Sequence, residues 1–361
     1  MPNHITTHIV LLQGTGLNER GWARYVSRFG HVVLIQRTFV EHVEIWEDGK
    51  LIDDGPTVPV KVNRTLAEMT FWIQNVFLIR RYWKYFTPQK VDVMLTPAYS
   101  GVLIALVLRR LGRVRKIVCT IVDYMPPVGS SHVRMHRRIT SWLSRWAAKH
   151  SDEVWTISPR IPTGDTNPRT YVMQFPVENY HVPPGVRTEI GYIGFPSPDH
   201  ALELLFEVCK RQKLRLNVIG DSPYLQSIKH LAPPDAVFHG ITSDLTKINA
   251  VLARCFCGYA IYRNIGPENY SYYGFPSKAI NWFANNTPVV TTQTSHFTQQ
   301  IETLGIGRVV EPKLEQIEQA VLDLKANAPA YYDAINRFRD KWNGEFEAFQ
   351  SERLSALLAE K

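Results

Sequence analysis

The chain has 361 residues, 45% of them hydrophobic, enough to bury two cores of ordinary size rather than one. It has no run of 18 or more apolar residues and no secretory signal at its N-terminus, so we expect a cytoplasmic protein without a membrane-spanning helix. Its four cysteines include no Cys-x-x-Cys pair, which argues against a zinc site, and we expect reduced, mostly buried thiols.

The net charge of +8 comes from the first half of the chain. Residues 1–180 contain 23 Lys+Arg and 14 Asp+Glu, a balance of +9, and the remainder contains 18 and 19, a balance of −1. A basic half suits nucleic acid, an anionic membrane or an acidic substrate. Because none of the usual nucleic-acid motifs is present, we expect no nucleic acid as a partner.

Short apolar runs alternate with helical patterns along the first half, as in parallel βαβ units. The first predicted strand covers residues 8–12, and a glycine-containing loop and a helix follow it. A hairpin insertion with its turn near Asp48-Gly49 is predicted over residues 43–61. The other strands predicted in this half cover residues 32–36, 91–96, 117–122 and 153–157.

The pattern breaks at Val182-Pro183-Pro184-Gly185, which indicates a linker because proline suppresses both helix and strand. A second α/β series follows, with strands predicted over residues 189–194, 214–219, 257–262 and 288–292. The predicted fold class is α/β, with two Rossmann-like doubly wound domains facing across a cleft where ligands bind. The predicted parts are domains over residues 1–182 and 183–328 and a C-terminal helix, 329–361, packing back toward the N-terminal domain.

The segment after residue 262 predicts an anion site. A buried strand ends at Tyr262, and a long loop leads to Ser277, which can cap a helix that begins at Lys278. Free backbone N–H groups at such a helix start bind phosphate. The helix dipole opposes a lysine in the first turn by roughly 0.3–1 kcal/mol, so Lys278 is interpreted as the partner of a diphosphate. The alternative is a surface lysine on an ordinary helix.

Other residues of this segment are candidates for donor binding, and three of them have an alternative structural interpretation. Asn281 lies one turn after Lys278 and shares its face. Tyr262 either stacks on a nucleobase or closes the core, and Arg263 has the same two readings. Glu268 either binds ribose hydroxyls or is only solvated.

The stretch Pro276-Ser277-Lys278-Ala279-Ile280-Asn281-Trp282 and its exit Asn286-Thr287-Pro288-Val289-Val290 resemble bacterial polysaccharide glycosyltransferases of the two-domain B-type (GT-B) fold, most closely the xanthan-pathway glucuronosyltransferases. That family has a Ser-x-Lys-x-x-Gln-Tyr helix start, so Asn281 stands where it has glutamine. The resemblance implies that Lys278 contacts the donor phosphates, that Tyr262 lies by the nucleotide and that Gly194 lies near the donor.

The resemblance extends to Lys116-Ile117-Val118-Cys119-Thr120-Ile121-Val122-Asp123, where the family's strand ends in its catalytic base, and this implies that role for Asp123. Inverting transfer needs one group to take a proton from the acceptor hydroxyl, and Asp123 is the only acid between Asp92 and Asp152. The alternative is a turn acid at a Tyr-Met-Pro-Pro bend. Gly14 and Gly16 follow the first strand, in the loop where the acceptor domain of this fold usually meets its substrate. They either leave space for the acceptor in the cleft or only form a turn.

Two aromatic, basic segments predict contact with an anionic membrane surface, as a peripheral protein on the inner face of the plasma membrane. The alternative is that the tryptophans are core residues under a solvated basic face. The residues concerned are Trp72, Arg80, Arg81, Trp83, Lys84, Arg137, Arg138, Trp142, Arg145 and Trp146.

The resulting hypothesis is an inverting glycosyltransferase that uses no metal and no cofactor. The implied donor is a nucleotide sugar, with UDP as the nucleotide and glucuronic acid as one candidate sugar. The implied acceptor is a polyprenyl-diphosphate-linked oligosaccharide or other glycan. A retaining GT-B enzyme, a sugar-nucleotide epimerase and a noncatalytic nucleotide-sugar-binding protein remain alternatives. A retaining enzyme would usually show a Glu-x7-Glu pair, and Glu268 has no acid at position 276.

Overall fold

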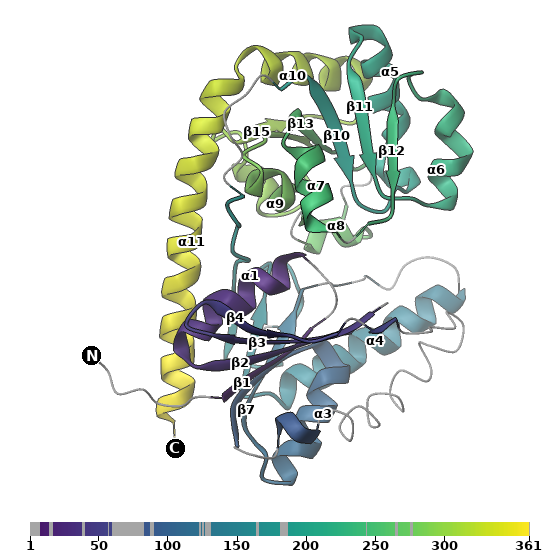
Figure 1. Cartoon of the computed structure of the whole chain (residues 1–361). Helices are drawn as coiled ribbons and strands as arrows, with labels where there is room; N and C mark the ends of the chain where they lie inside the picture. The colour runs from purple at the N-terminus through teal and green to yellow at the C-terminus, as the bar shows by residue number, and fades with distance from the viewer. Residues whose placement is uncertain are drawn as a thin grey trace. The chain divides into compact units, whose positions relative to one another are not determined.

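A computed structural model describes the chain as two compact units. Unit 1 comprises residues 1–176 and 344–361, and unit 2 comprises residues 177–343. Figure 1 traces the chain through both. The structure describes residues 8–13, 17–37, 40–56, 58–59, 83–86, 90–122, 124, 126, 131–163, 166–180, 187–242, 244–263, 266–274 and 277–360.

The sheet of unit 1 has the strand order β4-β3-β2-β1-β6-β7-β8-β9, with β5 paired to β3. Strands β1, β2 and β6 to β9 pair in parallel, and the hairpin strands β3 and β4 are antiparallel. The strands are β1 (His8–Gln13), β2 (His31–Arg37), β3 (Val40–Glu47), β4 (Lys50–Asp54), β5 (Val58–Pro59), β6 (Val91–Pro97), β7 (Val114–Ile121), β8 (Glu153–Thr156) and β9 (Thr170–Val172). The parallel core and the hairpin insertion are as the sequence predicted.

The hairpin turn shows why its position could be predicted. Asp48 and Gly49 both have positive φ, 49° and 76°, which is the backbone of a two-residue hairpin turn and which Asp-Gly adopts with little strain. The helical segments of unit 1 are α1 (Leu17–Val26), η1 (Ser27–Phe29), η2 (Trp83–Tyr85), α3 (Ala98–Arg110) and α4 (Ser131–Lys149).

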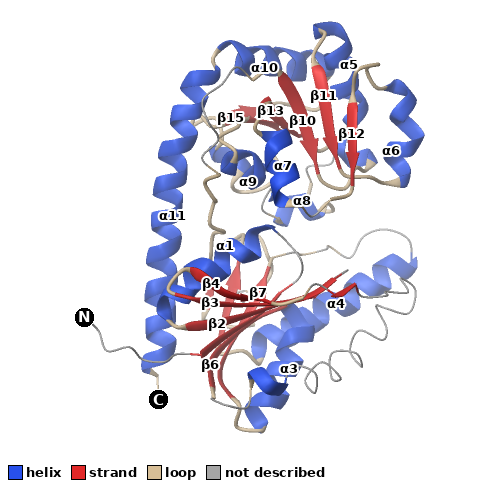
Figure 2. Ribbon diagram, viewed as in Figure 1, coloured by secondary structure: helices blue, strands red, loops and turns tan. Residues whose placement is uncertain are grey.

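Unit 2 contains a six-stranded parallel sheet of order β12-β11-β10-β13-β14-β15. In chain order this is 3-2-1-4-5-6, the doubly wound arrangement, with the topological switch between β10 and β13. The strands are β10 (Glu189–Ile193), β11 (Arg215–Ile219), β12 (Val237–Gly240), β13 (Cys255–Ala260), β14 (Val289–Thr291) and β15 (Gly307–Val309). Figure 2 shows the strands of this sheet accompanied by helices.

The helical segments of unit 2 are η3 (Pro198–His200), α5 (Leu202–Gln212), α6 (Pro223–Ile228), η4 (Lys229–Leu231), α7 (Leu245–Leu252), α8 (Tyr270–Tyr273), α9 (Ser277–Ala284), η5 (Thr298–Gln300), α10 (Leu314–Ala326) and the first part of α11 (Ala328–Ala359).

Alternation along β10 and β13 builds the two faces of the sheet of unit 2. Gly191 pairs in register with Gly258, and a Cβ at either position would lie within 2.5 Å of the Trp282 indole on α9. The glycines therefore make room for a fully buried tryptophan. The next pair, Tyr192 and Tyr259, lies in the core cluster that includes residues of α5 and α10. Because successive strand residues point to opposite faces, this alternation fixes which helix packs where.

The end of α11 is joined to unit 1 by buried charges. Glu153 on β8 is fully buried, contacts the Arg353 guanidinium and lies 3.0 Å from Arg169 Nη2. Its other carboxylate oxygen accepts from the Trp155 indole at 2.8 Å. A carboxylate buried in this way is stable only when its oxygens are satisfied, so these contacts hold the last turns of α11 on the sheet.

The structure adds elements that the sequence analysis did not identify, and shifts some bounds. Strands β9, β12 and β15 lie at sheet edges and are only partly buried, so they lack the apolar run that marks a buried strand. The compact units divide at residues 176 and 343, while the sequence-based limits were 182 and 328. The last helix is one continuous α11. All four cysteines are free and buried, as expected.

Candidate functional site

The carboxyl ends of β10 and β13 and the start of α9 meet in unit 2 at the topological switch of its sheet. Gly194 follows β10, Tyr262 follows β13, and Lys278 is the second residue of α9. Parallel sheets bind ligands at such a switch. Three residues predicted from separate parts of the sequence therefore lie in one place. Helix α9 ends at Ala284, and Asn286 follows it in a left-handed conformation with φ of 55°.

Lys278 is the centre of this site. Its Nζ donates to the Tyr192 hydroxyl at 3.1 Å, and it lies 4.9 Å from the Tyr192 ring centroid and 5.2 Å from that of Tyr262. Two aromatic faces attract an ammonium group by their quadrupoles. The site thus holds a cation among uncharged partners.

The charge of this lysine is not balanced by any carboxylate within 4 Å in the part of the chain that the structure describes. Lys278 is half-buried, and desolvation lowers its pKa from 10.5 to about 7. A bound anion would reverse this effect, because it would favour the ammonium form. The site is therefore electrostatically suited to a phosphate.

Gly194 brings the backbone close to that lysine. A Cβ on Gly194 would lie 2.7 Å from Lys278 Cε, and its φ of 127° is rarely adopted by other residues. A Cβ on Gly220 would lie 1.9 Å from the Gly194 carbonyl oxygen. Gly220 follows β11 and donates its N–H to the Gly240 carbonyl at 2.8 Å. Glycines thus allow the ends of β10, β11 and β12 to touch one another.

His200 is a buried neutral histidine next to the lysine. Burial, and then the charge of Lys278, lower its pKa from 6.5 to about 3. The Ser197 backbone N–H donates to His200 Nδ1 at 3.1 Å, which assigns the ring proton to Nε2. That Nε2 is buried and has no hydrogen-bond partner among the described residues. The ring lies edge-on to Tyr262 at 5.2 Å.

The remaining predicted donor-side residues have different surroundings. Tyr262 is 5% exposed and so closes the core while its ring faces Lys278. Arg263 is exposed and forms an ion pair with Glu203. Glu268 folds back onto its own loop, where it would meet a Cβ on Gly266 at 2.6 Å. Asn281 is half-buried on α9, and the Ser277 side chain lies outside the described residues although its backbone begins α9.

Sequence reasoning gave no role to Tyr192 or His200. The available signal for Tyr192 was its place in a buried strand two residues before Gly194, since a buried tyrosine hydroxyl needs a partner. His200 lies six residues after Gly194, and its sequence context carries no comparable signal.

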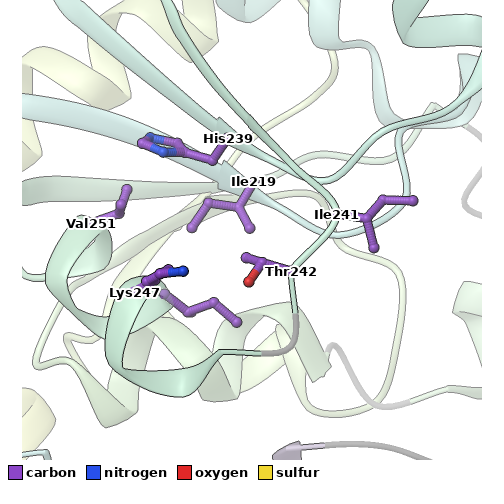
Figure 3. A pocket seen from close by; sticks show the side chains of 7 residues that line it. Ile219, His239, Ile241, Thr242, Lys247 and Val251 are labelled. Atoms are coloured by element: carbon purple, nitrogen blue, oxygen red, sulfur yellow. The ribbon is translucent and has the colours of Figure 1, made fainter. Parts of the chain in front are cut away.

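A cavity of about 290 Å³ opens farther along the same edge of the sheet, beyond Gly240 (Figure 3). Its walls come from the ends of β11 and β12 and from α7. Ile219 and Ile248 make part of an apolar floor, and Thr242 and Lys247 add polar groups. The complete lining is Ile219, His239, Ile241, Thr242, Lys247, Ile248 and Val251. His239 Nε2 lies 3.0 Å from Asn217 Oδ1, which fixes the ring.

Several predicted residues of unit 1 lie outside the described residues. These are the candidate base Asp123, the loop residues Gly14 and Gly16, and Trp72, Arg80 and Arg81. Asp123 comes two residues after the end of β7 in the chain. Trp83 and Lys84 lie on η2, where Arg113 stacks over the Trp83 ring at 5.8 Å.

Helix α4 carries two parallel rows of exposed side chains. The apolar row contains Met135, Ile139 and Trp142, which are 60%, 50% and 58% exposed, and ends at the half-buried Trp146. The basic row beside it contains exposed Arg134, Arg138, Arg145 and Lys149. Both rows recur at helical spacing and share one face of α4. Trp142 is therefore a surface residue rather than a core residue. Arg137, by contrast, is half-buried and donates to the Pro126 carbonyl.

Among the helices that the structure describes, none combines the length and the apolar character needed to cross a membrane. One group of described residues could in principle ligate a cation, His42, Glu44 and Asp54 on the β3–β4 hairpin. The Arg20 guanidinium donates to Glu44 and lies 3.3 Å from His42 Nε2. A guanidinium in this position balances the carboxylates and would repel a metal ion.

Comparison with known proteins rests on structure. No protein-family model matches the chain, and no curated protein matches it by sequence. The apo structure of OtsA matches 98% of this chain and 99% of its own, with a TM-score of 0.63 and 12% identity. A UDP-forming α,α-trehalose-phosphate synthase from Burkholderia xenovorans, solved with glucose-6-phosphate, matches 97% and 99% with a TM-score of 0.63 and 11% identity. TarM matches 90% and 74% with a TM-score of 0.59 and 13% identity.

These matches span both units of the chain. At such identities they define the fold and not the substrates. The chain therefore has the fold of the two-domain B-type glycosyltransferases.

Proposed function

We propose that the chain is an inverting glycosyltransferase that takes a sugar from a nucleoside diphosphate bound in unit 2. The observation that carries the proposal is Lys278, a half-buried lysine held between two tyrosine rings with no carboxylate partner in the described chain. A charged group taken out of water requires compensation. A donor diphosphate supplies it here, at the backbone of Gly194 and the N-terminus of α9.

The cavity beyond Gly240 indicates the direction of the nucleoside. The ends of β10, β11 and β12 form a continuous backbone edge through Gly194, Gly220 and Gly240. A diphosphate at Lys278 would therefore extend along this edge toward Thr242 and the apolar wall of the cavity. Apolar walls with a few polar groups suit a nucleobase.

The chemistry needs a proton acceptor and a stabilised leaving group. In the proposed mechanism Asp123 takes the proton from the acceptor hydroxyl as that oxygen attacks the anomeric carbon. The bond from this carbon to the diphosphate breaks, and negative charge builds on the leaving diphosphate. Lys278 and the first N–H groups of α9 stabilise that charge without requiring a metal.

The acceptor is proposed to be a polyprenyl-diphosphate-linked oligosaccharide, presented at a membrane surface. Supporting this, the apolar row of α4 could enter the headgroup boundary while its basic row meets anionic lipid. The donor sugar is left open between glucuronic acid and neutral sugars. The ion pair of Arg263 with Glu203 makes Arg263 a weaker candidate for binding a uronate carboxylate.

A retaining transferase is the second candidate. A trehalose-6-phosphate synthase studied for glycosyl transfer with retention matches 81% of this chain and 80% of its own, with a TM-score of 0.53 and 13% identity. Against this candidate, the Glu-x7-Glu pair of retaining enzymes is missing. With Glu268 as its first acid, the second would stand at position 276, which is Pro276.

The test is release of nucleoside diphosphate from a panel of UDP- and GDP-sugars in the presence of EDTA, with a lipid extract as acceptor. Turnover that survives EDTA and is lost in Lys278→Met together with donor binding supports the proposal. Donor binding without turnover on any acceptor would favour a binding protein, and conversion of the donor sugar without transfer would favour an epimerase. An anomer-resolved NMR spectrum of the product separates inversion from retention.

A further inference from the structure

Tyr192 links Lys278 to the loop after β10. This tyrosine is 1% exposed and is the second-last residue of β10. Its hydroxyl lies 3.1 Å from Lys278 Nζ, 3.1 Å from the Phe195 carbonyl oxygen and 3.1 Å from His200 Nδ1. One buried oxygen therefore touches the lysine, the loop and the histidine at once.

The direction of these hydrogen bonds follows from which groups can donate a proton and which can only accept one. A lysine amine donates to the tyrosine oxygen, so Tyr192 accepts from Lys278. His200 Nδ1 already accepts from the Ser197 N–H, so it too is an acceptor toward Tyr192. The single tyrosine proton is then shared between the Phe195 carbonyl and His200. The hydroxyl therefore connects Lys278 directly with Phe195 and, through His200, with Ser197.

This linkage matters because a lysine side chain is long and flexible. Fixing this side chain in one rotamer costs up to about 2 kcal/mol of conformational entropy, which would otherwise weaken ligand binding. Here the Tyr192 and Tyr262 rings flank the ammonium, and the backbone of Gly194 packs against the Lys278 methylenes. The lysine is ordered before any ligand binds.

We infer that Tyr192 is a positioning residue, which holds the Lys278 ammonium against the Gly194–Ser197 loop in the geometry that receives the donor diphosphate. This inference rests on the proposed function, because it assigns Tyr192 a task in the same anion site. Tyr192 does not itself contact the reacting atoms.

The neighbouring strand supplies a matched control. Tyr259 on β13 is the register partner of Tyr192, is fully buried in the same core cluster and donates its hydroxyl to the Ala201 carbonyl at 2.8 Å. Among the described residues, the Lys278 ammonium contacts the Tyr192 hydroxyl and the Tyr192 and Tyr262 rings, and it makes no such contact with Tyr259. Tyr259→Phe therefore removes an equally buried hydroxyl without touching the lysine.

The experiment compares Tyr192→Phe and Tyr259→Phe by calorimetric titration with UDP at pH 7.5, after circular dichroism has shown that each is folded. Phenylalanine keeps the ring and the core packing, so both variants should lose similar stability. We expect UDP affinity to fall about tenfold in Tyr192→Phe, as for loss of a hydrogen bond to a charged group, and to stay within about twofold in Tyr259→Phe. Equal affinities in the two variants would overturn the inference.

Two further readouts separate positioning from a general structural effect. Tyr192→Phe removes an acceptor that favours the ammonium form, so UDP affinity should begin to fall at a lower pH than in the wild type. Adding Tyr192→Phe to Lys278→Met should cause no further loss of affinity, because the two changes remove one interaction. Full additivity would contradict the inference. If Lys278→Met alone binds UDP normally, the proposed donor site is wrong rather than the role of Tyr192.

Discussion

Lys278 and Gly194, 84 positions apart in the chain, are packed so closely that a Cβ on the glycine would lie 2.7 Å from the lysine Cε. The contact joins the loop after the first strand of a doubly wound sheet to the first turn of a helix that follows its fourth strand. It places the lysine side chain directly against a backbone segment that has no side chain of its own.

Gly194→Ala should therefore disrupt donor binding. The new methyl group displaces Lys278, and alanine is strained at a φ of 127°. We expect UDP affinity to fall at least about tenfold, measured by calorimetry. Gly112→Ala is the control, since its φ is 71° but nothing lies within 4 Å of the added carbon. It should lose stability and leave UDP affinity unchanged; equal affinities in both variants would contradict the prediction.

Donor affinity should depend on pH through Lys278. Its pKa is lowered to about 7 in the free protein, and a bound diphosphate should raise it again. Affinity for a UDP-sugar, whose diphosphate stays ionised, should be flat below pH 7 and fall up to about tenfold per unit above it. Titrations from pH 6 to 9 measure this. Lys278→Met should show no such slope, and a wild-type profile as flat as that of the variant would refute the assignment.

Removing the lysine should stabilise the empty protein. In the unfolded chain its pKa is the ordinary 10.5 and in the folded chain about 7, so protonation favours unfolding between these values. The penalty is complete below pH 7 and disappears as pH rises through 10.5. Lys278→Met should raise the melting temperature at pH 7 by about 3 °C, with a smaller gain at pH 9.5. The exposed Lys247, which pairs with Asp244, serves as the control and should give no gain when changed to Met.

Asp123→Asn should abolish chemistry but not donor binding. The amide cannot accept the proton of the acceptor hydroxyl, so we expect kcat to fall by about 100- to 10,000-fold. Affinity for the UDP-sugar should stay within about twofold, because the proposed donor site lies in unit 2. Release of UDP and calorimetry measure the two effects. Unchanged turnover would remove Asp123 from the mechanism.

The exposed face of α4 should bind anionic vesicles. Replacing Met135, Ile139 and Trp142 together with serine should reduce binding to phosphatidylglycerol vesicles in a flotation assay by about tenfold or more. Arg138→Ala with Arg145→Ala should weaken binding about 30-fold at low salt, at about 1 kcal/mol for each charge. The control changes Val107 and Leu111, exposed on or just after α3, to serine. Equal losses in control and test variants would rule out a specific role for α4.

The sequence alone determined most elements of both units. Apolar runs of buried strands, the Asp48-Gly49 turn and the start of α9 at Ser277 are local signals, since each depends on residues within a few positions of one another. The prediction of an anion site has the same local basis, because a strand, a loop and the start of α9 are continuous in the chain. The edge strands β9, β12 and β15 are only partly buried and carry no such apolar run.

Only the tertiary structure decided what surrounds Lys278. Tyr192 reaches the lysine across 86 positions, and no periodicity relates two residues so far apart. Their meeting depends on the 3-2-1-4-5-6 strand order, which places the end of β10 beside β13 and the start of α9. Arg263 was predicted to lie beside the donor. In the structure its guanidinium instead forms an ion pair with Glu203. Local sequence fixes which residues form strands and helices, whereas long-range packing fixes which strand ends meet, and the proposed donor site lies where they meet.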